Sequence, residues 1–259
     1  KRLPEGRQPE LTYDESEFYA TDAFTDYSME FIKQGAKKKK PFFLYLAHSS
    51  PHFPIQAPAA TRDKYLPRYR KGWDVLRQER FERQQKIGLL TDAWKFTERS
   101  LVPNYPKGKK GPIDNGYGGQ KNPAWDTLSC DTREDLTYRM ALFAAMIDHV
   151  DQGVGRIIKQ LKELGQYENT LILFTSDNGA CYEWGPLGFD GGSRQGEHVL
   201  HKGESLKQMG LAGDKEMSVG SAWANLSNTP FRMYKHFNHE GGNCSPLIAH
   251  WPKGIKNPD

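Results

Sequence analysis

Two adjacent side chains with metal-binding potential, Asp177 and Asn178, follow the apolar run in "LILFTSDNGAC". A carboxylate and an amide carbonyl are hard oxygen donors of the kind that calcium and magnesium bind. Calcium takes roughly six to eight oxygens, so these two residues by themselves favour a structural Asx turn over a metal site. The same tripeptide at Asp114, in the glycine-rich stretch "GPIDNGYGG", has no strand before it and is predicted to be a surface turn.

Two further residues, His52 in "SPHFP" and Lys235 in "FRMYK", have side chains that can transfer a proton or bind an anion. From its residue type alone, His52 is either a general acid or a loop histidine with satisfied hydrogen bonds. Lys235 is either a contact for an oxyanion or an ordinary surface lysine.

The three cysteines, Cys130, Cys181 and Cys244, show no metal-ligand spacing, and their number is odd. The sequence therefore predicts neither a zinc site nor a full disulfide framework from them.

The elements that must position these residues alternate between helix and strand. Apolar residues recur at three- and four-residue steps between Glu134 and Gly165, which predicts a helix, and "TLILFT" after it predicts a buried strand. The run "PFFLYLAHSSPHFP" predicts another strand buried on both faces, and "PLIAHW" predicts a short one. This order predicts an α/β fold with a mostly parallel sheet and helices on both faces, whose ligands bind beyond the carboxyl ends of the strands.

The composition excludes several partners. The net charge is only +4, and the basic residues are dispersed apart from Lys37 to Lys40, which we interpret as a solvated helix end, so no nucleic-acid-binding surface is predicted. No apolar stretch approaches the roughly 18 residues of a membrane span, and "KRLPEGRQPE" lacks the apolar core of a signal peptide. The glycine-rich region from Trp184 to Gly220 is interpreted as the rim of a site. Its residues Arg194, His198 and His201 either bind an anionic sugar or are solvated.

Four segments, taken together and in order, resemble the sulfatase family in its arylsulfatase type. They are "PFFLYLAHSSPHFP", "YRKGWDVLRQERFERQQKIGLL", "MALFAAMIDHVDQGVGRIIKQLKELGQYENTLILFTSDNGA" and "WANLSNTPFRMYKHFNHEGGNCSPLIAHWPKGI". The resemblance implies an alkaline-phosphatase-like fold that hydrolyses sulfuric esters with one bound calcium ion. It implies that Asp177 and Asn178 coordinate the metal, that His52 lies near the leaving oxygen, and that Lys235 contacts the sulfate. A divalent cation and an ammonium would neutralise the charge of the sulfate while an imidazolium protonates the departing alcohol.

One departure from the family pattern concerns the nucleophile. Sulfatases use a formylglycine made from Cys/Ser-x-Pro-x-Arg, and Cys130 and Cys181 do not fit that pattern. Cys244 begins "CSPLI", with Ile248 where arginine is required, and is predicted to be a small buried residue. The family's N-terminal aspartate pair is also not found. We therefore interpret residues 1–259 as an incomplete sulfatase catalytic domain that lacks the N-terminal part and the C-terminal subdomain. The formylglycine and the machinery that generates it would belong to the missing N-terminal part.

The expected function is part of a calcium-dependent sulfatase acting on a small-molecule or carbohydrate sulfate ester, inactive as this chain alone. The alternatives are a phosphodiester or phosphonate ester hydrolase of the same superfamily, or a non-catalytic, degenerate sulfatase-like protein. The resemblance also implies a periplasmic or extracellular location.

Overall fold

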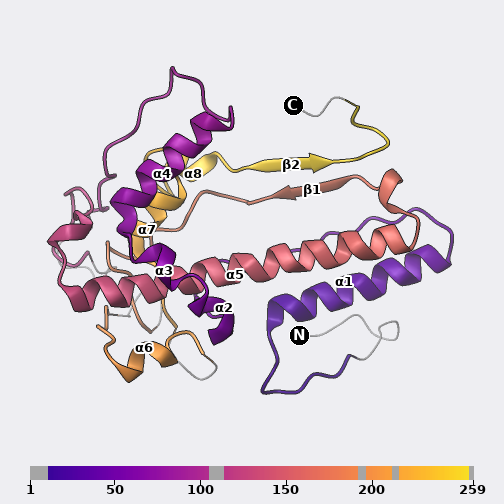
Figure 1. Ribbon diagram of the computed structural model, residues 1–259, viewed down its shortest axis with the longest axis horizontal. Coiled ribbons are helices and arrows are strands. Elements are labelled where there is room, and N and C mark those ends of the chain that lie inside the picture. The colour runs from indigo at the N-terminus through magenta and orange to yellow at the C-terminus, as the bar shows by residue number, and fades with distance from the viewer. Residues whose placement is uncertain (1–10, 105–113, 192–196, 212–215, 257–259) are drawn as a thin grey trace. The chain divides into compact units, whose positions relative to one another are not determined.

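The computed structural model describes residues 11–104, 114–191, 197–211 and 216–256 (Figure 1). Arg194 lies outside these residues. The helices and strands, in chain order, are α1 (Ala20–Lys37), α2 (Ala59–Asp63), α3 (Leu66–Tyr69), α4 (Gly72–Lys86), η1 (Trp125–Thr127), α5 (Cys130–Glu163), η2 (Tyr167–Asn169), β1 (Ile172–Thr175), α6 (Glu204–Gln208), α7 (Gly220–Ser227), α8 (Glu240–Asn243) and β2 (Leu247–His250). None of the described helices is both long enough and apolar enough to cross a membrane.

The chain divides into two compact units, and the first comprises residues 1–50, 146–174 and 247–259. In this unit α1 lies along the C-terminal part of α5 (Figure 1). The two helices approach closely at Gly153, where an added Cβ would press against the Thr25 hydroxyl. Polar contacts hold the helices on either side of this point: His149 Nδ1 lies 3.1 Å from Asp22 Oδ1, and Gln160 donates to the Met29 carbonyl at 2.7 Å.

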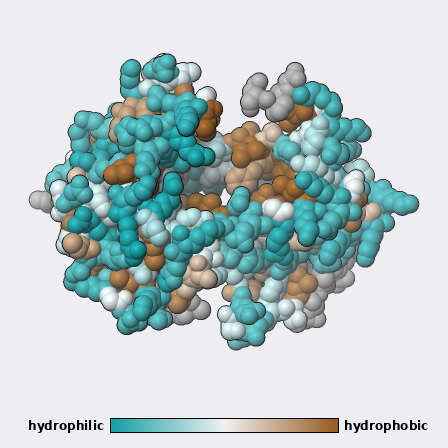
Figure 2. Space-filling view, viewed as in Figure 1, coloured by the Kyte–Doolittle hydropathy of each residue, from teal (hydrophilic) through white to brown (hydrophobic). Residues whose placement is uncertain are grey.

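The predicted sheet differs most from the structure. In the described part of the chain it has two strands, β1 and β2, which run in opposite directions (Figure 1), so the mostly parallel sheet is not found there. The strands are also exposed: Leu173 is 61% and Leu247 66% accessible, and hydrophobic residues reach the surface over them (Figure 2). Both strands occur where the sequence predicts them, but the prediction that "TLILFT" is buried is wrong.

The predicted strand at "PFFLYLAHSSPHFP" is not formed either. Phe43 is 92% exposed, and residues 41–49 form no ladder with any described residue. A strand buried on both faces needs paired neighbours and cover above and below, and apolar composition alone supplies neither.

The second unit comprises residues 51–145 and 175–246. Its core contains three tryptophans in mutual contact, Trp73, Trp125 and Trp223, with the rings of Trp73 and Trp223 edge to face at 5.2 Å. The indole N–H groups of Trp73 and Trp223 donate to the carbonyls of Pro123 and Leu136, which satisfies their polar atoms inside an apolar core. This core fixes α4 against α7 and supports the loops that carry the candidate site.

Several local predictions are confirmed. The helix expected between Glu134 and Gly165 is α5, and Lys38 to Lys40 are exposed beyond the end of α1. The first Asp-Asn-Gly copy is an Asx turn, in which Asp114 Oδ1 accepts from the Gly116 N–H at 2.9 Å.

Candidate functional site

The structure brings together two of the four predicted site residues. Lys235 Nζ lies 3.3 Å from His52 Nε2, although the two are far apart in the sequence. An ammonium can only donate, so the imidazole nitrogen that faces it accepts. An anion that approaches this pair would meet one cation and one group able to carry a proton.

The orientation of His52 is set by the backbone that follows it. His52 Nδ1 lies 2.8 Å from the Phe53 carbonyl oxygen, which can only accept, so Nδ1 carries the proton and Nε2 presents its lone pair. Ile55, three residues after His52, is buried and donates its N–H to Met217 O at 3.0 Å. The loop that carries His52 is therefore anchored to the core of its unit.

The loop that follows β1 runs against the segment that carries Lys235. Gly179 donates its N–H to Gly242 O at 3.0 Å, and a Cβ added at Gly179 would collide with the backbone oxygen of Gly241. One residue later, Ala180 accepts from the Lys235 N–H at 3.1 Å. These backbone contacts fix the Lys235 segment beside the loop that starts at Asp177.

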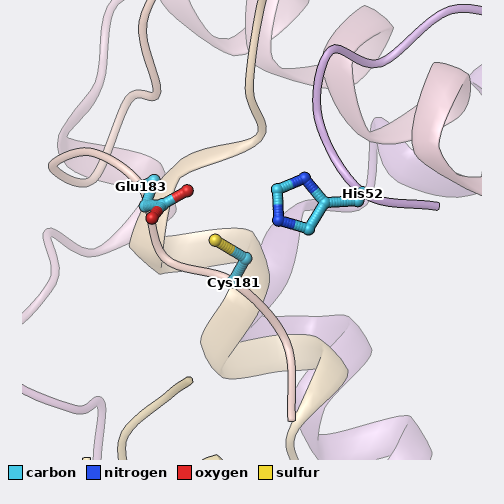
Figure 3. Close-up of side chains that lie close together, drawn as sticks. All are labelled: His52, Cys181 and Glu183. Atoms are coloured by element: carbon cyan, nitrogen blue, oxygen red, sulfur yellow. The ribbon is translucent and has the colours of Figure 1, made fainter. Parts of the chain in front are cut away.

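Tyr182 anchors that loop by its side chain. It is buried and packs with Ala224, Met233 and Tyr234. Its neighbours Cys181 and Glu183 have side chains that lie close to His52, with the Cys181 sulfur turned to the side of the Glu183 carboxylate (Figure 3). The His52 nitrogen, the Cys181 sulfur and a Glu183 carboxylate oxygen all lie within 4.8 Å of one another.

The cluster has an unusual electrostatic environment. Burial, followed by the nearby Glu183 carboxylate, raises the pKa of the Cys181 thiol. Without a cation, Cys181 is therefore a neutral thiol at neutral pH, not a nucleophilic thiolate. Glu183 is itself buried, and its Oε1 lies 3.0 Å from His236 Nε2.

The other two predicted site residues, Asp177 and Asn178, supply oxygen donors of the type that calcium binds, but too few. The Asp177 side chain is exposed, and the Asn178 amide nitrogen donates to Gly179 O at 2.9 Å, so its Oδ1 is the atom that could bind a metal. Among the described residues, Asp177 belongs to no group of three potential metal ligands. The residues present fit calcium in chemistry and not in number.

His198 and His201, in the predicted rim, each have a ring nitrogen facing a carboxylate. His201 Nε2 lies 2.9 Å from Asp190 Oδ1, and His198 Nε2 lies 3.4 Å from Asp135 Oδ2. Arg139, which is fully buried, bonds to both carboxylates at 2.9 and 2.6 Å. These histidines are therefore neither free anion ligands nor simply solvated.

Sequence reasoning missed Cys181, Glu183 and His236 as members of the site. The only local signal was the spacing of Cys181 and Glu183 around an aromatic residue, and it becomes meaningful only with His52, which comes from a distant loop. Cys244 was predicted to be buried, and this is wrong: it is exposed at the end of α8, where the chain enters the exposed strand β2. All three cysteines are free.

Comparison with known proteins places this chain in a family. The sequence model of the family described as Sulfatase matches residues 3–258. The chain belongs to the sulfatase family. This sulfatase chain is 32% identical over 242 residues to a sulfatase of Schizosaccharomyces pombe described as uncharacterized, covering 93% of this chain and 40% of that one. It is 27% identical over 233 residues to an arylsulfatase of Klebsiella aerogenes, covering 87% of this chain and 43% of that one.

The solved structure of yidJ from Bacteroides fragilis aligns with 92% of this sulfatase chain and 32% of its own, at 20% identity and a TM-score of 0.45. The chain spans less than half the length of the two curated relatives described above.

Proposed function

We propose that this chain supplies part of the site of a sulfuric ester hydrolase, in which Lys235 binds the sulfate group and His52 protonates the leaving alcohol. The observation that carries the proposal is the 3.3 Å contact between Lys235 Nζ and His52 Nε2. It joins, in one place, the two residues that match the sulfate-binding lysine and the leaving-group histidine of the family.

The charges of the pair explain how it would act. The Lys235 ammonium, 3.3 Å from His52 Nε2, can bind an anionic group that approaches the imidazole. With a sulfate ester bound there, an imidazolium at His52 can give its Nε2 proton to the departing oxygen. The Phe53 carbonyl holds the ring in the orientation that this transfer needs.

The metal and the nucleophile are the remaining parts of the proposal. Asp177 and Asn178 would hold a calcium ion together with further oxygen ligands, because among the described residues Asp177 belongs to no group of three His, Cys, Asp or Glu side chains. A bound calcium ion would neutralise sulfate charge. No nucleophile is assigned in this chain, because none of its cysteines fits Cys/Ser-x-Pro-x-Arg. An exported location, periplasmic or extracellular, rests on the family resemblance.

The substrate is proposed only as a class, a small-molecule or carbohydrate sulfate ester. The relatives' names cover both kinds: one is an arylsulfatase, and another, 25% identical over 189 residues, is an N-acetylglucosamine-6-O-sulfatase of Bacteroides thetaiotaomicron.

Sulfate binding tests the proposal directly. We expect Lys235→Met to weaken the binding of inorganic sulfate to this chain roughly tenfold or more, because hydrogen bonds to charged groups contribute about 1.5–3 kcal/mol. Isothermal titration calorimetry measures the change. Lys86→Met, which removes an exposed lysine at the end of α4, is the matched control and should bind like the wild type. An equal loss of sulfate affinity in both variants would mean that the effect comes from net charge. It would contradict the assignment of Lys235 as the sulfate-binding residue.

Turnover is a separate measurement. We expect this chain alone not to hydrolyse a chromogenic aryl sulfate in the presence of calcium, because no residue in it is assigned as the nucleophile. Metal-dependent turnover by the 259-residue chain would contradict this part of the proposal.

A second candidate is a phosphodiester or phosphonate ester hydrolase. The chain is 29% identical over 184 residues to a protein of Trinickia caryophylli named a multifunctional alkaline phosphatase superfamily protein, covering 68% of this chain and 32% of that one. Phosphate that competes with sulfate at Lys235 with a much higher affinity would favour this candidate. Sulfate binding without turnover, even in a longer protein that contains a nucleophile, would instead favour a non-catalytic, degenerate sulfatase-like protein.

A further inference from the structure

The cluster of His52, Cys181 and Glu183 has a donor set that the calcium proposal does not use. It offers one nitrogen, one sulfur and one carboxylate oxygen, all within 4.8 Å of one another, and no other group of three such side chains occurs in the described part of the chain. Mixed nitrogen, sulfur and oxygen donors suit zinc and similar transition metals, whereas calcium and magnesium require oxygen.

Glu183 gives an independent indication that a ligand belongs here. Its side chain is only 10% exposed, and its Oε2 is buried without a hydrogen-bond partner, while His236 holds Oε1 at 3.0 Å. A buried carboxylate oxygen with no partner is costly. A cation between Oε2 and the neighbouring donors would satisfy it.

The other two donors can turn to the same point. The proton of His52 is on Nδ1, so Nε2 carries the lone pair, which accepts from Lys235 when no metal is bound and can turn to a metal because His52 is exposed. In a tetrahedral zinc site the ligand atoms lie roughly 3.5 Å apart, given Zn–S and Zn–N lengths of about 2.3 and 2.1 Å. Because no two of the three donor atoms are more than 4.8 Å apart, no pair has to approach by more than about 1.3 Å, which side-chain rotations on two loops can supply.

We propose that this cluster binds Zn²⁺ through His52 Nε2, Cys181 Sγ and a Glu183 oxygen, with a fourth position open to water. On binding, the sulfur–hydrogen bond of Cys181 breaks, the proton passes to solvent, and the thiolate forms the bond to the metal. No oxidation or reduction takes place.

Zinc at this position has a consequence that rests on the proposed function. It occupies the His52 nitrogen assigned to protonate the leaving group, and it separates His52 from Lys235. Zinc therefore inhibits the hydrolase site, whereas calcium at Asp177 and Asn178 would support it.

Cobalt(II) binding to the whole 259-residue chain tests the site without any turnover assay. We expect one Co²⁺ to bind with a near-ultraviolet sulfur-to-cobalt band and strong visible bands typical of four-coordinate cobalt. Zn²⁺ should abolish the bands by displacing the cobalt, whereas a large excess of Ca²⁺ should leave the bands unchanged.

Variants assign the ligands. Cys181→Ser should lose the sulfur band, and His52→Asn and Glu183→Gln should each weaken cobalt binding at least tenfold. Cys130→Ser and Cys244→Ser, at the two exposed cysteines, are the matched controls and should keep the band. Thermal unfolding of each variant without metal shows whether it is folded.

Two results would overturn the proposal: a sulfur band that survives in Cys181→Ser, or no stoichiometric cobalt binding to the folded wild-type chain. These outcomes are independent of the hydrolase proposal. Sulfate binding that depends on Lys235 can fail while cobalt binding persists, and cobalt binding can fail while sulfate binding persists.

Discussion

Single residues beneath the site decide where Lys235 points, and Tyr234 is the clearest of them. Its ring is fully buried, and its hydroxyl accepts from Asn122 Nδ2 at 2.6 Å. Asn122 in turn accepts from the Ser221 hydroxyl at 2.6 Å. A chain of buried hydrogen bonds thus joins α7 to the residue that precedes Lys235.

Tyr234→Phe breaks this chain with little change of shape. It leaves one N–H of Asn122 buried without an acceptor, so we expect a loss of about 1–3 kcal/mol in the free energy of unfolding, measured by urea denaturation. Tyr45→Phe, at an exposed tyrosine, is the control and should change stability by less than about 0.5 kcal/mol. A Tyr234→Phe protein as stable as the wild type would show that water replaces the hydroxyl.

Only part of the site was predictable residue by residue. Residue types made His52, Lys235, Asp177 and Asn178 candidates, and family resemblance selected their roles. Neither source could reveal that Cys181 and Glu183 lie against His52, because that contact depends on the burial of Tyr182 between them. Contacts between distant loops depend on tertiary packing and leave no periodic pattern in the sequence.

At the level of elements, α5 carries a buried ion network through Arg139. Besides its two carboxylate partners, Arg139 donates to three carbonyls, those of Phe189, Ser218 and Val199, at 3.1 to 3.2 Å. The burial of this cation is compensated by acceptors in the loops of the predicted rim, Trp184 to Gly220. Arg139 therefore ties those loops to the helix.

Arg139→Met would leave Asp135 and Asp190 buried without their cation. We expect a loss of about 3–5 kcal/mol in the free energy of unfolding, measured by denaturant titration. Arg133→Met, on the same helix, removes a partly exposed arginine 3.9 Å from Asp126 and should cost at most about 1 kcal/mol. Similar costs for the two variants would mean that the buried network contributes no more than a surface pair.

The loop that carries His201 should confer a pH-dependent stability. The hydrogen bond from His201 to Asp190 raises the pKa of His201 above its ordinary value of 6.5. A group whose pKa is raised on folding adds stability that is fully present below its unfolded pKa and is lost as the pH rises through the folded value.

We therefore expect the loss of stability in His201→Gln to be largest below pH 6.5 and to shrink as the pH rises through the raised folded pKa. Thermal unfolding over a pH series measures it. His239→Gln, at an exposed histidine, is the control. A loss that grows with pH would contradict the assigned ion pair.

The elements themselves were predictable to different degrees. The periodicity of α5 located the helix because one of its faces is buried over many turns. The apolar runs at β1 and β2 located strands but gave the wrong burial, because such runs do not show which strands or helices cover them. The run at residues 41–54 forms no strand for the same reason.

At the scale of the whole molecule, the two units differ in how well their elements are covered. Seven of the residues in α7 are buried, from Gly220 to Leu226, whereas β2 is exposed along most of its length. Local opening is easiest where few buried apolar contacts hold a backbone hydrogen bond.

Amide hydrogen exchange should reveal this difference. We expect the amides of α7 to exchange at least about tenfold more slowly than those of β1 and β2, because opening α7 exposes the tryptophan core. Mass spectrometry of peptic fragments measures both regions in one sample. Exchange in β2 as slow as in α7 would show that the exposed sheet is protected in solution, for example by self-association.

The close crossing of Gly179 and Gly241 has a practical consequence for protein engineering. Since no side chain fits at either glycine, the loop with Cys181 and the loop with Lys235 can be transplanted only as a pair. If only one of the two loops were grafted onto another scaffold, the backbone contacts that align it with the second loop would be lost. In a library in which Gly179 and Gly241 are replaced by every amino acid, nearly all folded variants should keep glycine at both positions. Sequencing the folded variants would therefore show which residues must be transferred together.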